Sequence, residues 1–97
     1  MAIIGNFTKT QHGFIGNIQT LTLKAKVSVT PAGEKSNDKA PDFRIHAAKS
    51  EIGAGWARKS EGGHDYVSMK LDDPSFSQPI FANLVERDGE YDLIWSR

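Results

Sequence analysis

Cysteine is absent from this sequence of 97 residues. Without it the chain can form neither a disulfide framework nor a thiolate metal site, so packing or self-association has to stabilise the fold. Long hydrophobic runs are absent too, and the first residues carry no basic leader. We therefore expect an intracellular, cytoplasmic protein that has no signal peptide and does not span a membrane.

Net charge is also absent, because twelve Lys and Arg residues balance twelve Asp and Glu residues. This balance argues against a protein that depends on a large excess of positive charge to hold nucleic acid. The charge is nevertheless uneven: residues 1–59 hold nine basic and four acidic side chains, and residues 60–97 hold three and eight. Strands from both halves can interleave in one sheet, so mixed charge on a solvated surface is the simpler interpretation.

Helical periodicity is absent as well. No window repeats apolar residues at positions i, i+3, i+4 and i+7, whereas short alternating runs bounded by turn-forming residues recur about every ten residues. We predict a single all-β domain over residues 1–97, a small antiparallel sandwich or barrel-like sheet built from three hairpins. Residues 30–41 combine turn formers with charge and lack a bulky apolar side chain, so we expect a mobile, flexible loop there.

The first two hairpins can be written with explicit registers. The first turns at His12-Gly13 and places Phe7 opposite Ile18. The second turns through residues 60–63, and its core face is predicted to hold three cross-strand pairs, Ile52 with Leu71, Ala54 with Met69, and Trp56 with Val67. Trp56 is therefore interpreted as a core residue. The reverse face is flat and polar, and it carries Lys59, Tyr66 and Lys70.

The third hairpin turns at Asp88-Gly89, a dipeptide suited to a type I′ turn because both positions tolerate a positive φ. Its register sets Leu84 against Leu93 and Ala82 against Trp95. The opposite face is also apolar and consists of Phe81, Val85 and Ile94. Both faces require burial, which indicates either a central hairpin of a sandwich or barrel, or a homodimer interface formed by these three residues.

The groups that enzymes use are sparse. No Gly-x-Ser-x-Gly elbow marks a nucleophile, and the histidines at 12, 46 and 64 share no ligand spacing. Asp72 and Asp73 are adjacent and could hold a hard cation, but such a pair more often caps a turn before a proline. We predict a protein that is not an enzyme and takes no metal, no cofactor and no small-molecule substrate, and a hydrolase or nuclease using this pair is the least supported alternative.

Basic and aromatic residues gather around the second hairpin and the segment before it. Bases stack on an exposed ring while Lys and Arg meet phosphates, so this mixture is typical of a face that binds single-stranded DNA or RNA. The candidate binding residues are Arg44, His46, Lys59, Tyr66 and Lys70. Tyr66 has a second interpretation, because its ring can simply shield the backbone of Gly55.

Several motifs together resemble a known bacterial family. They are Ile52-Gly53-Ala54-Gly55-Trp56, the segment from Asp65 to Phe76, the segment from Ile80 to Val85, the closing Leu93-Ile94-Trp95-Ser96-Arg97, and near the start Ile4-Gly5-Asn6-Phe7-Thr8-Lys9. Over nearly its whole length the chain resembles the family catalogued as domain of unknown function 736. The resemblance implies a small protein without an assigned activity, typical of alphaproteobacteria and often encoded near conjugation and replication genes of plasmids and integrative elements. This context favours a DNA-associated role and supplies no functional residues.

Two functions remain open at this point. The first is a non-enzymatic β-sheet protein of mobile-element context that binds single-stranded nucleic acid. The second is a protein-interaction or homo-oligomeric assembly module that does not bind nucleic acid. Such a module would join through Phe81, Val85 and Ile94, and would offer a basic partner the acidic edge of Glu86, Asp88, Glu90 and Asp92.

Overall fold

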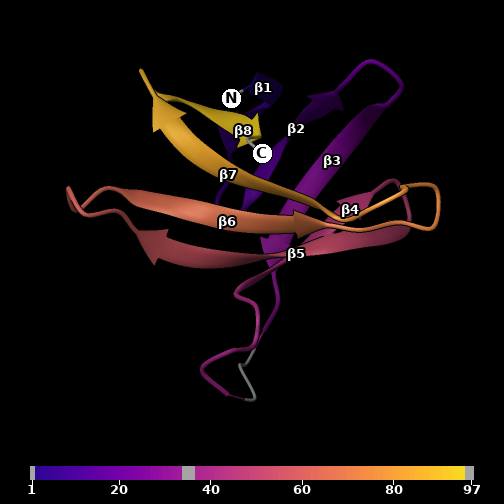
Figure 1. The fold of residues 1–97 in the computed structure, drawn as a ribbon. Coiled ribbons are helices and arrows are strands. Elements are labelled where there is room, and N and C mark those ends of the chain that lie inside the picture. The colour runs from indigo at the N-terminus through magenta and orange to yellow at the C-terminus, as the bar shows by residue number, and fades with distance from the viewer. Residues whose placement is uncertain (1, 34–36, 96–97) are drawn as a thin grey trace.

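The computed structural model describes residues 2–33 and 37–95, and they form one closed antiparallel barrel (Figure 1). Each strand pairs with its neighbours in the chain, and the last strand pairs with the first. The strands are β1 (Ala2–Lys9), β2 (Phe14–Gln19), β3 (Lys24–Pro31), β4 (Phe43–Ala47), β5 (Ser50–Lys59), β6 (Asp65–Leu71), β7 (Ile80–Arg87) and β8 (Glu90–Trp95). Within the described part of the chain no helix is long and apolar enough to cross a membrane.

Strand alternation determines which side chains fill the barrel. In β6, for example, Val67, Met69 and Leu71 are buried while the residues between them lie on the outside, as the period of two in a strand requires. An eight-stranded barrel is just wide enough for such side chains to fill its interior. The largest fully buried side chains are Ile18, Val27, Val29, Ile45, Met69, Leu71, Leu84 and Leu93.

Phe7 points into the interior where β1 pairs with β2, and it lies directly opposite Gly16. A Cβ atom at Gly16 would stand 2.1 Å from the carbonyl oxygen of Asn6 and 2.7 Å from the Phe7 ring. No larger residue fits there without displacing backbone. The glycine therefore makes room for an aromatic side chain that is only 2% exposed.

Two β-bulges bend the sheet so that it can close. The pairing of β1 with β8 shifts between Ile3 and Gly5, and the pairing of β4 with β5 skips Ile52. In both places the extra residue, Ile4 or Ile52, points inward and is buried. Bulges increase local twist and curvature, which a small barrel needs.

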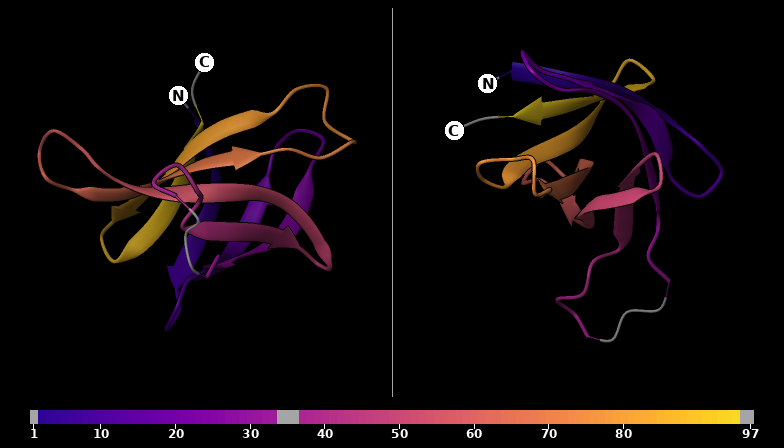
Figure 2. Two further views of the ribbon diagram at one scale, coloured as in Figure 1. Left: turned by 90° about the horizontal axis from the view of Figure 1, so that it is seen from below. Right: turned by 90° about the vertical axis from the view of Figure 1, so that its right-hand side faces the viewer.

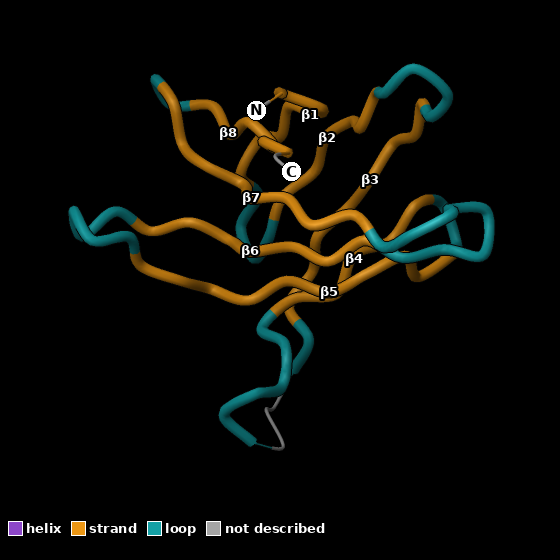
Figure 3. Tube along the Cα trace, viewed as in Figure 1, coloured by secondary structure: helices purple, strands orange, loops and turns teal. Residues whose placement is uncertain are grey.

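The barrel is compact apart from the segment between β3 and β4. Figures 2 and 3 show that the described parts of this segment extend away from the strands, whereas the connections from β4 to β5 and from β7 to β8 are tight turns. Its two ends are tied together by a hydrogen bond from the Ala32 amide to the Asp42 carbonyl at 3.0 Å. Residues 34–36, at the centre of the expected mobile loop, lie outside the described residues, so the mobility of residues 30–41 stays a prediction.

The all-β prediction is confirmed, and of its two alternatives the barrel is correct. Eight strands form it rather than three hairpins alone. The third hairpin has the predicted register, with Leu84 opposite Leu93 and Ala82 opposite Trp95. The first hairpin is displaced by two residues, so that Phe7 faces Gly16 and not Ile18.

The predicted register of the second hairpin is wrong by one residue. Its loop contains five residues and not four: the Ser60 amide donates to the His64 carbonyl at 2.9 Å, and the last strand pair is Lys59 with Asp65. A one-residue shift moves every side chain of one strand to the opposite face. Trp56 consequently faces outward, and the interpretation of Trp56 as a core residue is wrong.

Candidate functional site

The register of β4 to β7 arranges polar and aromatic side chains in rows across the outside of the barrel. One row runs from Arg44 through Ala54 and Lys70 to Phe81. The second and third rows start from β5 and end on β7. We call the side chains of these three rows on β5, β6 and β7 the outer face, and it consists of Ala54, Trp56, Arg58, Tyr66, Ser68, Lys70, Phe81, Asn83 and Val85.

Three aromatic side chains stand on the outer face, one on each strand. Trp56 and Tyr66 are half-buried, and Phe81 is 62% exposed. The ammonium group of Lys70 lies 6.0 Å from the centroid of the Phe81 ring, at the limit of a cation–π contact. The indole N–H of Trp56 donates to the carbonyl of Lys39 at 3.0 Å. The ring is therefore held in place by the segment before β4.

The outer face contains cations and no acid. Arg58 and Lys70 are exposed on it, and Arg44 and His46 flank it on β4. The nearest acidic side chain on β5 is Glu51, which lies 3.6 Å from the Arg44 guanidinium and 3.9 Å from the His46 imidazole. Both pairs are solvent-exposed and weak, so a phosphate can compete for Arg44.

The structure brings together four of the five predicted binding residues. Arg44 and His46 lie on β4 and Tyr66 and Lys70 on β6, with β5 between them, and all four face outward. Lys59 does not join them, because the corrected register turns it to the rim, where its ammonium lies 3.8 Å from the Asp65 carboxylate. Arg58 takes its place on the outer face.

Trp56 and Arg58 are the two functional candidates that the sequence argument missed. The signal was present in β5: Gly53, Gly55 and Ala57 are the small members of the alternation, and the space above Gly55 is already occupied by Val67, whose methyl carbon would lie 2.9 Å from an added Cβ. An interior crowded from β6 can accept only small residues on β5. The large side chains of β5 must therefore point outward.

The predicted dimer residues also share one surface. Phe81, Val85 and Ile94 all face outward on β7 and β8, with Ile94 opposite Asn83. Ile3 pairs with Ile94 across the seam between β1 and β8 and is 51% exposed. The predicted homodimer interface is therefore an extended apolar strip, and its occupation stays a prediction.

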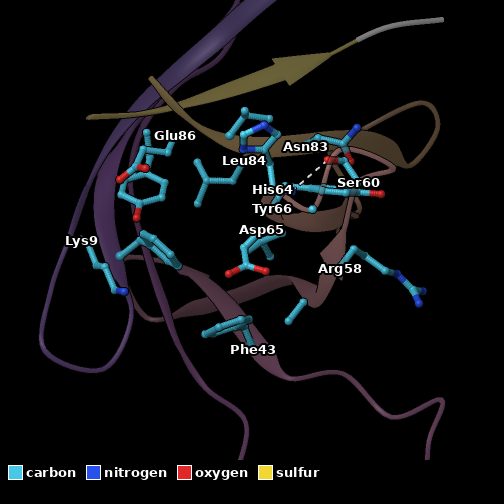
Figure 4. Close-up of a pocket in the computed structure, with 16 residues that line it drawn as sticks. Lys9, Phe43, Arg58, Ser60, His64, Asp65, Tyr66, Asn83, Leu84 and Glu86 are labelled. Carbon is cyan, nitrogen blue, oxygen red and sulfur yellow. Dashed lines mark hydrogen bonds between the residues drawn. The ribbon is translucent and has the colours of Figure 1, made fainter. Parts of the chain in front are cut away.

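One end of the barrel opens into a cavity of 1040 Å³ (Figure 4). We call it the mouth, and the residues that matter here are Lys9, Phe14, Phe43, Asp65, Glu86 and Tyr91. The Phe14 ring meets the rings of Tyr91 and Phe43 edge to face, with centroids 4.9 Å and 6.1 Å apart. Burial raises the pKa of Tyr91, and the negative charge of Glu86, a hydrogen bond to Glu86 and the charge of Asp65 raise it further.

The adjacent carboxylates Asp72 and Asp73 lie in the loop after β6. Asp73 accepts hydrogen bonds from the Ser75 hydroxyl at 2.5 Å and from the Ser75 amide at 2.9 Å, and these bonds lower its pKa. This geometry is that of a carboxylate that caps a turn. Across residues 2–33 and 37–95 no three His, Asp or Glu side chains are close enough to hold a metal ion together.

Comparison with known proteins gives one match. A family model described as "Protein of unknown function (DUF736)" matches residues 3–97. No curated protein and no solved structure matches the chain. No enzyme family is therefore named for it, and its chemistry has to be inferred from its own surface.

Proposed function

Because this chain belongs to the DUF736 family, which has no assigned function, we propose its role from the outer face: it binds single-stranded nucleic acid there and catalyses no reaction. The observation that supports this proposal is which types of residue occupy the outer face. The nine positions of the outer face hold three aromatic rings and two cations, and no carboxylate. The exposed Glu51 of β5 lies at the margin of this face, beside Arg44 and His46. Such a surface offers bases a stacking platform and does not repel phosphates.

Stacking and charge supply the binding energy in this proposal. Each base stacked on a ring contributes about 1–3 kcal/mol, and stacking tolerates any base because each one has a π-face. Trp56 and Tyr66 stand on neighbouring strands, and Lys70 and Arg58 lie beside them to meet the phosphates. Only a single strand exposes its bases to rings in this way, so duplex DNA is expected to bind more weakly.

The test is fluorescence anisotropy of labelled single-stranded DNA, single-stranded RNA and duplex DNA at two salt concentrations. We expect preference for a single strand and an affinity that falls as salt rises. Tyr66→Ala should weaken binding about tenfold through lost stacking. Lys70→Ala should also reduce the slope of log K against log salt by about 0.7.

The matched control is Lys24→Ala, which removes an exposed cation from β3, outside the outer face. Its effect should be smaller than that of Lys70→Ala. Equal effects of the two lysine variants would mean that charge alone holds the strand and that the outer face has no special role. Absence of binding by the folded wild-type protein at low salt would overturn the proposal.

A second candidate function is homodimerisation through the apolar strip of Ile3, Phe81, Val85 and Ile94. It is favoured by the exposure of Ile3 on β1 and Phe81 on β7, at 51% and 62%, on either side of β8. Multi-angle light scattering tests it directly, and Ile94→Asp is expected to convert a dimer to a monomer. A wild-type monomer at high concentration would exclude it. Ile94→Asp leaves Lys70 and Tyr66 in place, so the two functions are separable.

A further inference from the structure

The mouth is a concave site that borders the outer face and shares Arg58, Tyr66, Asn83 and Val85 with it. It opens where β5 ends and β6 begins, and it is closed on the other side by β1, β2 and β8. Its volume of 1040 Å³ is at the upper end of the range for small-molecule sites. Figure 4 shows the Asp65 carboxylate at the centre of this opening, while the guanidinium of Arg58 extends away from it.

Aromatic rings form the wall of the mouth. Phe14 is 8% exposed and stands between the half-buried rings of Phe43 and Tyr91, with interplanar angles of 63° and 64°. Edge-to-face contacts of this kind fix the neighbouring rings in position. The π-face of an aromatic ring is negative and attracts a cation that comes within about 6 Å.

Negative charge adds to the attraction of the rings. Burial is the main cause of the raised pKa of Tyr91, and the charges of Glu86 and Asp65, which belong to different strands, raise it further. A field that opposes a second negative charge at this position favours a positive one by the same physics. Lys9, Arg58 and His64 also line the mouth, so the negative field is local to Asp65, Glu86 and the Tyr91 hydroxyl.

Two lysines of the chain lie at the mouth, and one of them already contacts Asp65. Lys59 lies 3.8 Å from Asp65, but both side chains are highly exposed, at 70% and 86%, and such pairs contribute little. Lys9 lines the opposite side of the mouth. An incoming cation can displace the Lys59 ammonium from Asp65, because the long lysine side chain gains freedom when it is released.

We propose that the mouth binds a small organic cation, an ammonium or guanidinium group on an apolar body, against Phe43 and Tyr91 with Asp65 and Glu86 as counter-charges. The concave shape, with a volume in the range of small-molecule sites, favours a free small molecule over a polypeptide segment. The proposal does not rest on nucleic-acid binding, because none of the four contacting residues belongs to the outer face, although Arg58 and Tyr66 also line the mouth.

The experiment is an NMR titration that follows the ring resonances of Tyr91 and the amide of Asp65. Choline is the first probe, and 3,3-dimethylbutan-1-ol is its neutral isostere; agmatine supplies a guanidinium. We expect choline or agmatine to shift these resonances with an affinity about tenfold higher than that of the neutral isostere. Equal affinity for choline and the isostere, or no shift with either cation, would overturn the proposal.

Variants test the proposal because they are expected to change the cation affinity in opposite directions. Asp65→Asn combined with Glu86→Gln should reduce cation affinity about tenfold, whereas Lys59→Met should increase it by freeing Asp65. Lys49→Met makes the same change at the turn between β4 and β5, at the opposite end of the barrel, and should leave cation affinity unchanged. All these residues are exposed, so the variants are expected to fold, which far-UV circular dichroism checks.

A peptide probe distinguishes a cation on a free small molecule from a cation on a protein side chain. An acetylated and amidated lysine tripeptide presents the same ammonium group on a polypeptide. If it binds while choline and agmatine do not, the mouth recognises a protein side chain and the small-molecule assignment is wrong. Weakened binding of choline in Lys59→Met would likewise contradict the role given to Asp65.

Discussion

At the scale of single residues, two turns place non-glycine residues at positive φ. Asp88 has φ 53° and precedes Gly89 at 84°, the arrangement of a type I′ turn. Ala48, in the turn between β4 and β5, has φ 56°. Asp tolerates this region through local hydrogen bonds, but alanine has no such compensation.

Ala48→Gly should therefore stabilise the protein. Relief of the Cβ clash outweighs the greater freedom of glycine in the unfolded chain, and we expect a gain of about 0.5–1 kcal/mol. Urea denaturation, read as an increase in the midpoint at constant m-value, measures it. Lys49→Gly, at the neighbouring position without positive φ, is the control and should destabilise. A loss of stability in Ala48→Gly would show that the turn is not strained.

Tyr91 makes the stability of the folded protein depend on pH in the alkaline range. Its pKa is raised above the ordinary 10.0 by burial and by Glu86 and Asp65, so the folded state resists ionisation more than the unfolded chain does. The stability linked to Tyr91 is complete below pH 10 and is lost as pH rises through the raised pKa. Tyr91→Phe should weaken this alkaline loss.

The titration itself can be followed by ultraviolet absorbance of the phenolate. Glu86→Gln removes the charge of the carboxylate and should move the pKa of Tyr91 back toward its ordinary value. Tyr66→Phe leaves Tyr91 as the sole tyrosine, since the chain has two, and so isolates its signal. A pKa of Tyr91 that does not respond to Glu86→Gln would contradict the contact.

At the scale of elements, the hairpins show how far sequence predicts structure. The turn at Asp88-Gly89 admits few conformations, so the register of β7 with β8 follows from it. The loop of residues 60–64 is not specified by a dipeptide, and hydrogen bonds between Ser60 and His64 decide its length. Strand existence was predictable from alternation, but register depended on loop geometry that the residues alone do not express.

The candidate site inherited that error in register. Arg44, His46, Tyr66 and Lys70 were placed correctly because they lie on β4 and β6, whose outward faces follow from simple alternation. Residues of β5 were assigned to the wrong faces. The bulge at Ile52 adds to the difficulty, because it lets Ile52 and Gly53 both contribute to the inner side of one strand.

The corrected register of β5 can be tested by comparing two truncations. Met69→Ala removes a side chain that is 1% exposed and should cost about 2–5 kcal/mol. Trp56→Ala removes a larger but half-buried outward side chain and should cost less. Thermal or urea unfolding of both variants gives the answer. A greater loss for Trp56→Ala would return the tryptophan to the core and restore the predicted register.

At the scale of the whole molecule, the strand order makes the uneven distribution of charge along the sequence uneven in space as well. Because the strands follow the chain around the barrel, β1 to β5 form one continuous arc of the closed sheet and β6 to β8 form the rest. The basic first half and the acidic second half therefore do not interleave. The outer face lies at their boundary, with Arg44 and Arg58 toward the basic side.

Closure also brings β1 and β8 together, so that Ala2 pairs with Trp95. A circular permutant that joins these strands by a short linker and opens the exposed loop between Gly62 and Gly63 should retain the barrel. We expect an unchanged far-UV spectrum and a melting temperature within a few degrees of the wild type.

The control permutant opens β6 between Met69 and Lys70, which breaks a strand that is paired on both sides. It should not fold. If the permutant opened at Gly62 also fails to fold, the pairing of β1 with β8 is not the closure that the barrel requires.

The pairing of β1 with β8 also determines the order in which the strands can pair during synthesis. Seven of the eight strand pairings join neighbours in the chain and can form as soon as each hairpin emerges, but β1 has no second partner until β8 has been made. Until then its outer edge is open, and unpaired edges recruit other chains. The nascent protein is therefore most prone to aggregate just before its last strand appears, and its final folding step is the joining of its two most distant segments.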